Sequence, residues 1–437
     1  MKQELNEFSA VKISDNQLVP WPRVAAVGAM VAFSLPTFVT GLEVYQALEP
    51  IQAFWALVIG SIIIFAIGGV MGVIGARTRM SSYLLVRVAF GDKGASVVNI
   101  AFTISLLGWF GLNINLFGDA VSRLAIDVFN LGIAPLTLAI IASFCMTLTT
   151  VIGFKAINWL ATLMVPVLAG VTLLLGYSAL SEKSFEQILA TQKVATLTLG
   201  DGISAVVGAI IIGAIILPDI TRFVKHWSSA IYIAFISYVV VQLVVMGSAG
   251  LAGATSGKAD ILDIMIDLGL GIGASIIVIA GTWVLNSLNL YSAVLGTTAT
   301  FPKLNSTAVT IGLGLLGIFV ALLNLLDNFI TFIFYLSIIF VPVAGIIISD
   351  YLFIRPQAYN IESLADNRAI APKGFIAWVI SATFAVLSTK GLIATPSGIA
   401  AIDAIILAAI VYTALSWNER SSKHSTKHST KHSKTNS

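Results

Sequence analysis

The chain has 437 residues, of which 57% are hydrophobic and only 10% are Asp, Glu, Lys or Arg, and its mean hydropathy is +0.96. A soluble globular protein carries roughly a quarter of charged residues, so the composition excludes that class together with disordered, collagen-like and disulfide-scaffold proteins. The formal net charge of +3 is too small to indicate nucleic-acid binding. Such a composition is typical of a membrane protein with almost nothing outside the bilayer.

Twelve apolar stretches are long enough to cross a bilayer as helices, which takes about 20 residues each. They cover residues 24–48, 52–76, 95–130, 132–153, 156–180, 198–217, 229–252, 271–297, 308–326, 329–350, 373–394 and 397–416. The sequence therefore predicts an all-α membrane protein with twelve transmembrane helices. The segment 257–270 carries three aspartates on one helical face, and we expect it to lie along the membrane interface.

The two ends of the chain are polar. Residues 1–23 show no cleavable signal pattern, and residues 417–437 repeat Lys, His, Ser and Thr without an apolar face. We interpret them as a cytoplasmic N-terminal segment and a disordered cytoplasmic tail. With the N-terminus inside, nineteen of the 24 Lys and Arg fall in cytoplasmic segments and only four on the opposite side. The positive-inside rule then predicts a cytoplasmic (inner) membrane protein with both termini in the cytoplasm.

Residues suited to catalysis are scarce. The single cysteine, Cys145, sits in an apolar run, and only His226 of the four histidines lies outside the tail. A Ser-His-Asp triad, a zinc site or a haem site needs more than this, and no Walker-type loop is present. We therefore expect a protein that is not an enzyme and that has no cofactor and no metal site.

The first helix contains a proline among polar residues. Polar groups in hydrocarbon are costly, so those that remain are candidates for a transport pathway. Pro36, two residues after Ser34, removes a helical hydrogen bond and leaves the carbonyls near Ala32 and Phe33 without intrahelical partners. Such carbonyls can hold a cation or a polar ligand. The alternative is a simple proline kink whose carbonyls are satisfied by local hydroxyls.

The sixth helix contains a second weak point. Gly208 and Gly213 permit either local unwinding or close helix packing. The two weak helices are five helices apart, a spacing typical of two inverted five-helix repeats that hold a substrate where both helices break. We therefore predict repeats over 24–180 and 181–350, followed by helices eleven and twelve within 351–416.

Aromatic and amide side chains occur in two other helices. Trp109 in the third helix offers an indole face on which a flat ring could stack, and Asn113 lies one turn further on. In the eighth helix, Asn286 and Asn289 share a face, and their amides can both donate to and accept from a nucleobase edge. The alternatives are helix packing for the tryptophan and hydrogen bonds between helices for the asparagines.

Several ionisable residues lie within predicted helices. Glu43 could relay a proton or serve an outer gate, whereas Asp403 is interpreted as structural. Asp119 and Arg123 are four residues apart, so we expect them to pair with each other.

Four stretches follow one another along the chain: SYLLVRVAFGDKG at 82–94, GWFG at 108–111, PDITRF at 218–223 and VPVAGIIISDYL at 341–352. In this order they resemble the nucleobase:cation symporter-1 family, in particular its bacterial cytosine permeases. The resemblance covers nearly the whole span from residue 24 to 416. It implies a leucine-transporter-type fold of ten core helices in two inverted repeats plus two more helices. It also implies uptake of a nucleobase or related ring driven by sodium or protons.

The resemblance also implies a binding site. In the family the base stacks on the tryptophan that matches Trp109, and its edge is read partly by helix-eight asparagines, whose best matches are Asn286 and Asn289. The family's helix-three glutamine is matched here by Leu106, and its helix-six serine, second aromatic residue and second serine are matched by Ala209, Ile210 and Ile212. Because an unpaired donor or acceptor costs about 1–3 kcal/mol, we do not expect this pocket to read cytosine in the same way.

The family's sodium site is altered as well. Its paired helix-eight threonines are matched by Val284 and Leu285, which supply no hydroxyl. The remaining candidate ligands are backbone carbonyls near Ala29, Phe33 and Gly281. The run 286–292 is closer to the fungal purine-cytosine branch, which is taken to be proton-coupled. A proton is therefore the predicted coupling ion in preference to sodium.

Taken together, the sequence predicts a secondary active transporter that imports a purine or pyrimidine nucleobase by alternating access. The alternative is a carrier from the same family for hydantoin, allantoin, a nucleoside or a vitamin-precursor pyrimidine. The expected partners are the heterocyclic solute and the lipid bilayer, and the oligomeric state is left open. The predicted substrate-binding residues are Ser34, Trp109, Asn113, Ala209, Ile210, Gly213, Asn286 and Asn289. The predicted ion-coupling residues are Ala29, Phe33, Gly281 and Glu43.

Overall fold

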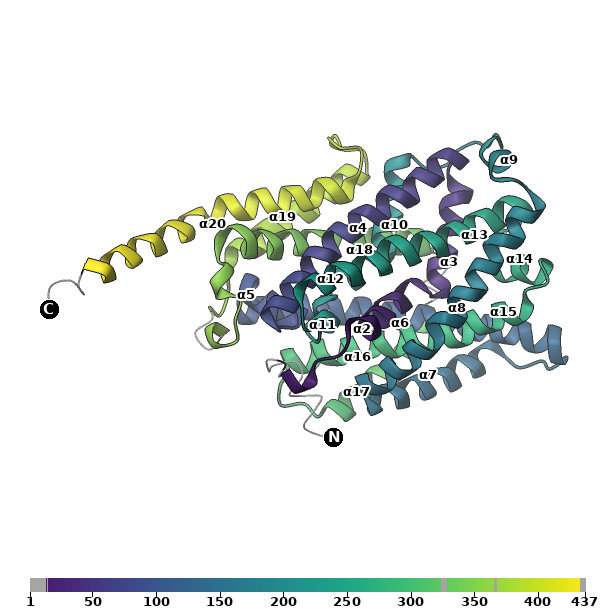
Figure 1. The fold of residues 1–437 in the computed structure, drawn as a ribbon, viewed down its shortest axis with the longest axis horizontal. Helices are drawn as coiled ribbons and strands as arrows, with labels where there is room; N and C mark the ends of the chain where they lie inside the picture. Colours follow the sequence, from purple (N-terminus) through teal and green to yellow (C-terminus); the bar gives the residue numbers. More distant parts are fainter. Residues whose placement is uncertain (1–12, 14, 324–327, 365–367, 433–437) are drawn as a thin grey trace.

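The computed structural model describes residues 13, 15–323, 328–364 and 368–432, which form a bundle of helices (Figure 1). The main helices are α2 (Trp21–Ala32), α3 (Leu35–Ala47), α4 (Pro50–Thr78), α6 (Asp92–Phe129), α7 (Pro135–Ile152), α8 (Phe154–Glu182), α10 (Leu199–Ile215), α12 (Trp227–Phe235), α13 (Gln242–Ser256), α15 (Gly271–Ile276), α16 (Thr282–Thr300), α17 (Ser306–Ala321), α18 (Phe329–Ser349), α19 (Pro372–Thr389) and α20 (Ala400–His432). Three π-helical turns continue α12, α15 and α18, namely η2 (Ile236–Val241), η3 (Ile277–Gly281) and η5 (Asp350–Ile354). The short helices are η1 (Asp15–Gln17), α5 (Ser82–Phe90), α9 (Phe185–Leu189), α11 (Pro218–Thr221), α14 (Ile261–Asp267), η6 (Pro356–Ala358) and η7 (Glu362–Leu364).

The number of spans differs slightly from the prediction. Within the described residues, ten helices are long and apolar enough to cross a membrane, or eleven if the bent pair α2 and α3 counts as one span. The ninth predicted helix, 308–326, is represented by α17, which has 16 residues. At 1.5 Å per residue it measures about 24 Å, less than the ~30 Å hydrocarbon core. Residues 324–327 lie outside the described residues. The all-α membrane fold is confirmed, whereas the count of twelve is not.

The predicted break in the first helix is present. α2 ends at Ala32, α3 begins at Leu35, and their axes differ by 50°. Ser34 has extended backbone angles, φ −117° and ψ 150°, and Pro36 occupies the first turn of α3, where a missing N–H costs nothing. The Ser34 and Thr37 hydroxyls both donate to the Val31 carbonyl, at 3.1 and 3.4 Å. The break is therefore real, and local hydroxyls satisfy one of its freed carbonyls.

The predicted break in the sixth helix is wrong in position. α10 is continuous through Gly208 and Gly213, and the chain leaves the helix only at Ile216 and Leu217, before α11. A Cβ atom on Gly208 would overlap the carbonyl oxygen of Ile333 in α18. This glycine therefore allows two helix backbones to approach closely, which was the alternative interpretation, and does not unwind α10.

The core and the lipid-facing surface are on different helices. α10 lies in the middle of the bundle, against α4 and α18, and twelve of its seventeen residues are buried. By contrast, α7 and α8 expose large apolar side chains such as Phe144, Trp159 and Leu173. An apolar surface of this extent is stable only when lipid covers it. The distribution of exposure agrees with a membrane-embedded bundle.

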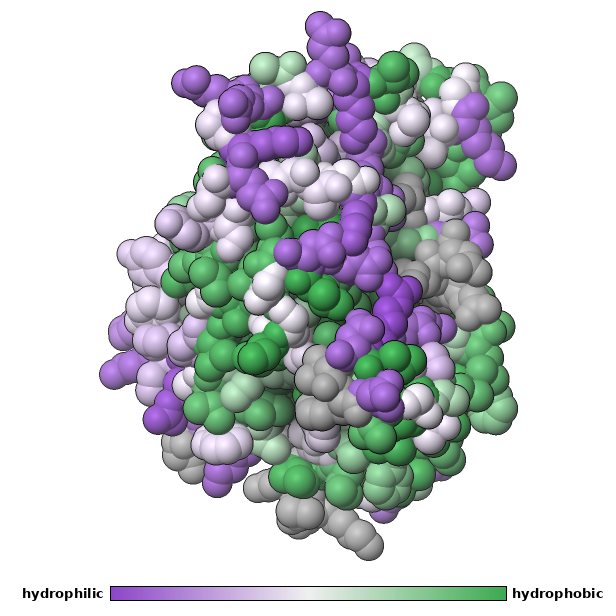
Figure 2. Space-filling model, turned by 90° about the vertical axis from the view of Figure 1, so that its right-hand side faces the viewer, coloured by the Kyte–Doolittle hydropathy of each residue, from purple (hydrophilic) through white to green (hydrophobic). Residues whose placement is uncertain are grey.

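Polar elements gather at the two ends of the bundle. α5 and α11 lie at one end, and α9 and α14 lie at the other (Figure 1). Figure 2 views the end with α9 and α14, where hydrophilic residues run between hydrophobic patches. At this end Arg123 pairs with Asp260 at 2.8 Å and approaches Asp263 at 3.7 Å. The expected Asp119–Arg123 pair is therefore wrong, because α14 brings two carboxylates to the same arginine.

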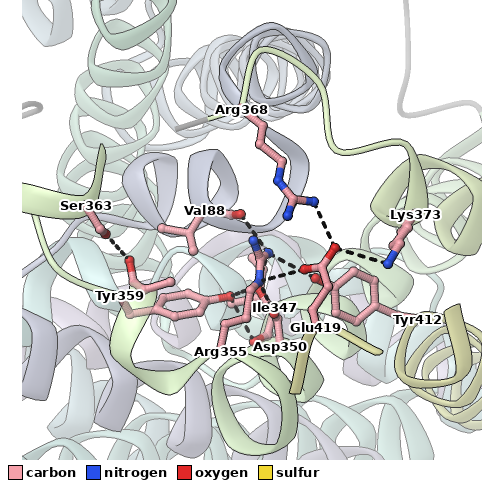
Figure 3. A network of polar contacts seen from close by, with 11 residues as sticks. Val88, Ile347, Asp350, Arg355, Tyr359, Ser363, Arg368, Lys373, Tyr412 and Glu419 are labelled. Carbon is pink, nitrogen blue, oxygen red and sulfur yellow. Dashed lines mark hydrogen bonds and ion pairs between the residues drawn. The ribbon is translucent and has the colours of Figure 1, made fainter. Parts of the chain in front are cut away.

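A polar network joins α18, α20 and α5 at the opposite end (Figure 3). Arg355 binds the fully buried Asp350 at 2.7 Å and donates to the Val88 carbonyl of α5 at 3.0 Å. Burial acts to lower the pKa of Arg355, but the hydrogen bond and charge of Asp350 outweigh it and raise that pKa above its ordinary value. Arg368 and Lys373 both bind the carboxylate of Glu419 in α20, at 2.8 and 3.0 Å. We call these residues the α20 network.

The helix α20 extends beyond the predicted span 397–416. Its backbone remains helical to His432, within the segment 417–437 that the sequence assigns to a disordered tail. No glycine or proline occurs between residues 400 and 432 to end the helix. Residues 433–437 lie outside the described residues.

Candidate functional site

A cavity lies where α2 and α3 meet, in the middle of the bundle. Its walls come from α2, α3, α6, α10, α11, α16 and the π-helical turn η2. Six of the predicted substrate-binding residues line it: Ser34, Trp109, Ala209, Ile210, Gly213 and Asn289. Segments far apart in the sequence thus converge at the helix break, as the sequence predicts.

Trp109 points into the bundle and not towards lipid. Its side chain is 7% exposed and lines the cavity. Phe332 and Phe329 of α18 contact it edge to face, with ring centroids 5.3 and 6.2 Å away. Such contacts fix the orientation of the indole. The ring is therefore held in place beside the cavity before any ligand arrives.

Two predicted asparagines do not line the cavity. Asn113 Nδ2 donates to Asn286 Oδ1 at 3.3 Å, and Asn286 Nδ2 donates to the Phe110 carbonyl at 3.1 Å. Both residues are fully buried between α6 and α16, where they join the two helices. Positions three apart on a helix differ by about 60° in direction. That difference directs Asn289 into the cavity and Asn286 towards α6.

The wall formed by α10 is apolar. Ala209, Ile210 and Ile212 line the cavity together with Leu106 of α6. Polar groups are correspondingly few, and they include the hydroxyls of Ser34 and Thr37, which lie 3.1 Å apart. The cavity therefore offers an aromatic face, one amide, one carboxyl group and a small number of hydroxyls.

Sequence reasoning missed Ser292 of α16 and two titratable residues of the cavity. Asp219 of α11 and Tyr238 of η2 both line it, and both are buried. Asp219 belongs to the PDITRF motif at 218–223, which follows the actual end of α10 at Ile215 and not the expected break at Gly208 and Gly213. Tyr238 had no signal of its own, because the π-helical turn changes which residues of its helix face inward.

The predicted ion-coupling residues lie in two places. The Phe33 carbonyl oxygen approaches Gly281 so closely that a Cβ atom there would lie 2.6 Å from it. The Ala29 carbonyl accepts from the Phe33 N–H at 3.0 Å. Glu43 is half-buried on α3 and is not among the cavity-lining residues.

Near this contact, α16 supplies mainly apolar side chains. Val284 is fully buried, and Leu285 lines the cavity. Thr282, which follows the turn η3, carries a buried hydroxyl without a hydrogen-bond partner in the described part of the chain. It is the hydroxyl nearest in sequence to Gly281, and the sequence analysis did not consider it.

Comparisons with known proteins identify the family of the chain. The model of the family described as permease for cytosine/purines, uracil, thiamine, allantoin matches residues 25–415. The cytosine permease of Escherichia coli (strain K12) is 28% identical over 371 residues, which are 83% of each chain. A putative purine-cytosine permease of Bacillus subtilis (strain 168) is 32% identical over 120 residues, 25% of this chain and 26% of that protein.

Solved structures share the fold. Mhp1, a nucleobase-cation-symport-1 family transporter in a closed conformation with bromovinylhydantoin bound, gives a TM-score of 0.81 at 17% identity over 92% of this chain and 93% of that chain. A Na⁺-coupled sialic acid symporter gives 0.66 at 14% identity over 91% and 90%. These similarities concern the fold alone, and they agree with the predicted leucine-transporter-type architecture. The family match shows more: the chain belongs to the family of permeases for cytosine/purines, uracil, thiamine and allantoin, and it is a nucleobase-type secondary transporter and not an enzyme.

Proposed function

We propose that this permease imports a nucleobase or a closely related flat heterocycle across the cytoplasmic membrane, together with a proton. One observation carries the proposal: a single cavity at the α2–α3 break brings together Trp109, Asn289 and Ser34. Trp109 stacks on the ring, Asn289 reads its edge, and the Ser34 hydroxyl supplies a further hydrogen bond. The excess of Lys and Arg in alternate loops supports an orientation with both termini in the cytoplasm.

Ligand screening tests the solute class. A compound at 100 times its dissociation constant adds about 2.7 kcal/mol to the free energy of unfolding, so a thermal-shift screen of purified protein ranks ring compounds directly. We expect purines, pyrimidines or hydantoins to stabilise it, and uptake of the labelled hits into proteoliposomes to follow the same order. Absence of any ring compound among the stabilising ligands and transported solutes contradicts the proposal.

The apolar α10 wall supports a second candidate solute. Ala209, Ile210 and Ile212 present no hydrogen-bonding side chains to a ring edge. A heterocycle with an apolar substituent, such as a substituted hydantoin, leaves fewer hydrogen-bonding groups unpaired in the cavity than a ring with polar groups on every edge. The same thermal-shift screen separates the two candidates when it compares each ring with and without an apolar substituent. The unsubstituted ring stabilises the protein more if the solute is a plain nucleobase, and the substituted ring stabilises it more if the solute carries such a group.

The two helix-eight asparagines are expected to respond differently to substitution. Asn289→Leu removes a cavity amide, so solute affinity falls about 5- to 30-fold while the unfolding temperature stays near that of the wild type. Asn286→Leu leaves Asn113 and the Phe110 carbonyl without their partner, at a cost of about 1–3 kcal/mol in stability. Thermal unfolding and solute binding of both variants check this. The reverse pattern assigns solute recognition to Asn286.

Proton coupling predicts that uptake rises as the external pH falls and does not depend on sodium. The physical reason is that Val284 and Leu285 supply no hydroxyl near the Phe33 carbonyl, and a bound sodium ion needs several oxygens. Uptake into proteoliposomes with pH and sodium varied separately measures this. Thr282→Val is the control and is expected to leave uptake unchanged. Strict sodium dependence that disappears in Thr282→Val refutes proton coupling and identifies a sodium ligand.

A further inference from the structure

Asp219 supplies the only carboxyl group among the described residues that line the cavity. It lies on α11 and is 4% exposed. The Ser82 backbone N–H and hydroxyl both donate to its Oδ1, at 2.8 and 2.9 Å. Its Oδ2 is buried and has no hydrogen-bond partner in the described part of the chain. One oxygen is thus anchored to α5, while the other is left with unused hydrogen-bonding capacity.

The surroundings of Asp219 contain both charge and hydroxyl groups. In the described part of the chain, the titratable and charged groups near it include Arg222 at the end of α11, Tyr83 of α5, Tyr291 of α16 and Tyr238 of η2. Arg79 at the end of α4 donates to the Arg222 carbonyl at 2.9 Å. Arg222 is fully buried, and its Nε donates to the Asp219 carbonyl at 3.1 Å. The ionised carboxylate therefore balances a buried positive charge, an attraction that the low local dielectric strengthens. The tyrosines remain neutral at ordinary pH and contribute hydroxyls only.

This arrangement suits a group that gains and loses a proton without moving. A proton added at Oδ2 leaves both Ser82 hydrogen bonds to Oδ1 in place, because Oδ1 still accepts. It also removes the charge that balances the buried guanidinium of Arg222. An unpartnered buried acceptor is costly unless water, an ion or a proton satisfies it.

We propose that Asp219 carries the coupling proton of this transporter and presents it to the solute. A proton from external water forms an O–H bond at Oδ2, and the neutral acid donates that O–H to an acceptor on the ring. After the solute leaves, the O–H bond breaks, the proton passes to cytoplasmic water, and the carboxylate again balances the charge of Arg222. One proton enters with each solute. The inference rests on the proton coupling proposed above and names the group that performs it.

The test compares exchange with accumulation in proteoliposomes. Asp219→Asn keeps the shape of the side chain but cannot titrate, so exchange of labelled for unlabelled solute is expected to fall less than accumulation does. The variant is also expected to lose accumulation driven by a pH gradient by at least about tenfold, and to show no solute-evoked proton uptake. Asp403→Asn is the matched control, because Asp403 is also a buried carboxylate that accepts from a serine N–H, but it does not line the cavity. It is expected to behave like the wild type in all three measurements.

A second variant keeps the carboxyl group and covers the case in which Asp219→Asn does not fold. Ser82→Ala removes one donor to the carboxylate, so the pH at which uptake is half-maximal is expected to rise by about half a unit or more. An unshifted pH profile in Ser82→Ala, or gradient-driven accumulation by Asp219→Asn, overturns the assignment. A wild-type protein that shows no solute-evoked proton uptake overturns the proposed coupling itself, whatever the variants do.

Discussion

Replacing Trp109 with alanine is expected to weaken solute binding and uptake about 5- to 150-fold. Stacking of a base on an aromatic side chain is worth about 1–3 kcal/mol, and each 1.4 kcal/mol is a tenfold change in affinity. The indole is fixed by Phe332 and Phe329 before the solute arrives, so little of the stacking energy is lost in ordering it. Solute titration of the purified variant and its initial rate of uptake measure the effect.

Two further variants separate stacking from packing. Trp109→Phe keeps an aromatic face and is expected to lose less than Trp109→Ala. Trp283→Ala removes a tryptophan that lies outside the cavity lining and donates to the Thr149 hydroxyl at 3.1 Å, so solute affinity is expected to stay near that of the wild type. If Trp109→Ala binds and transports the solute as well as the wild type does, Trp109 does not stack on the solute.

Adding one methyl group at Gly208 is expected to lower the unfolding temperature by several degrees. The new Cβ atom overlaps the Ile333 carbonyl oxygen, so the backbones of α10 and α18 must separate. Overpacking of a tight contact typically costs about 1–3 kcal/mol, and rigid helix backbone cannot move aside as a side chain does. Thermal unfolding of Gly208→Ala in detergent measures the loss.

Two other glycine-to-alanine variants are the controls for this result. Gly170→Ala on α8 meets no atom within 4 Å and is expected to leave stability unchanged or slightly improved. Gly213→Ala meets Val31 Cγ1 at 3.1 Å and is expected to cost less than Gly208→Ala. If Gly208→Ala unfolds at the wild-type temperature but transports poorly, α10 opens at this glycine during transport after all.

Sequence reasoning succeeded where the physical cause was local. Pro36 and Ser34 lie within one turn of the break they produce, because a proline N–H is missing whatever surrounds it. The meaning of Gly208 depended on Ile333, which lies more than 100 residues later in the chain. Arg123 likewise pairs with Asp260 and Asp263 of α14 instead of the nearer Asp119. Partners of this kind follow from helix packing, which one sequence does not reveal.

In the candidate site, too, the sequence predicts local features and does not predict partners that are distant in the chain. Trp109 and Asn289 follow from residue type and helix number alone, and the structure brings both to one cavity. Asn286 shares a helical face with Asn289 in the sequence, yet its amide is used between α6 and α16. Within the regular helix α16, positions three apart differ by about 60° in direction, which is enough to separate the cavity from the contact with α6.

The α20 network has a practical consequence for anyone who shortens the chain or fuses a reporter to its end. Glu419 lies three residues past the predicted end of the last span, yet its carboxylate binds Arg368 and Lys373. A deletion that begins at residue 417 leaves those two cations facing each other without a shared anion. Trimmed versions for crystallisation or fluorescence are therefore best cut after Arg420.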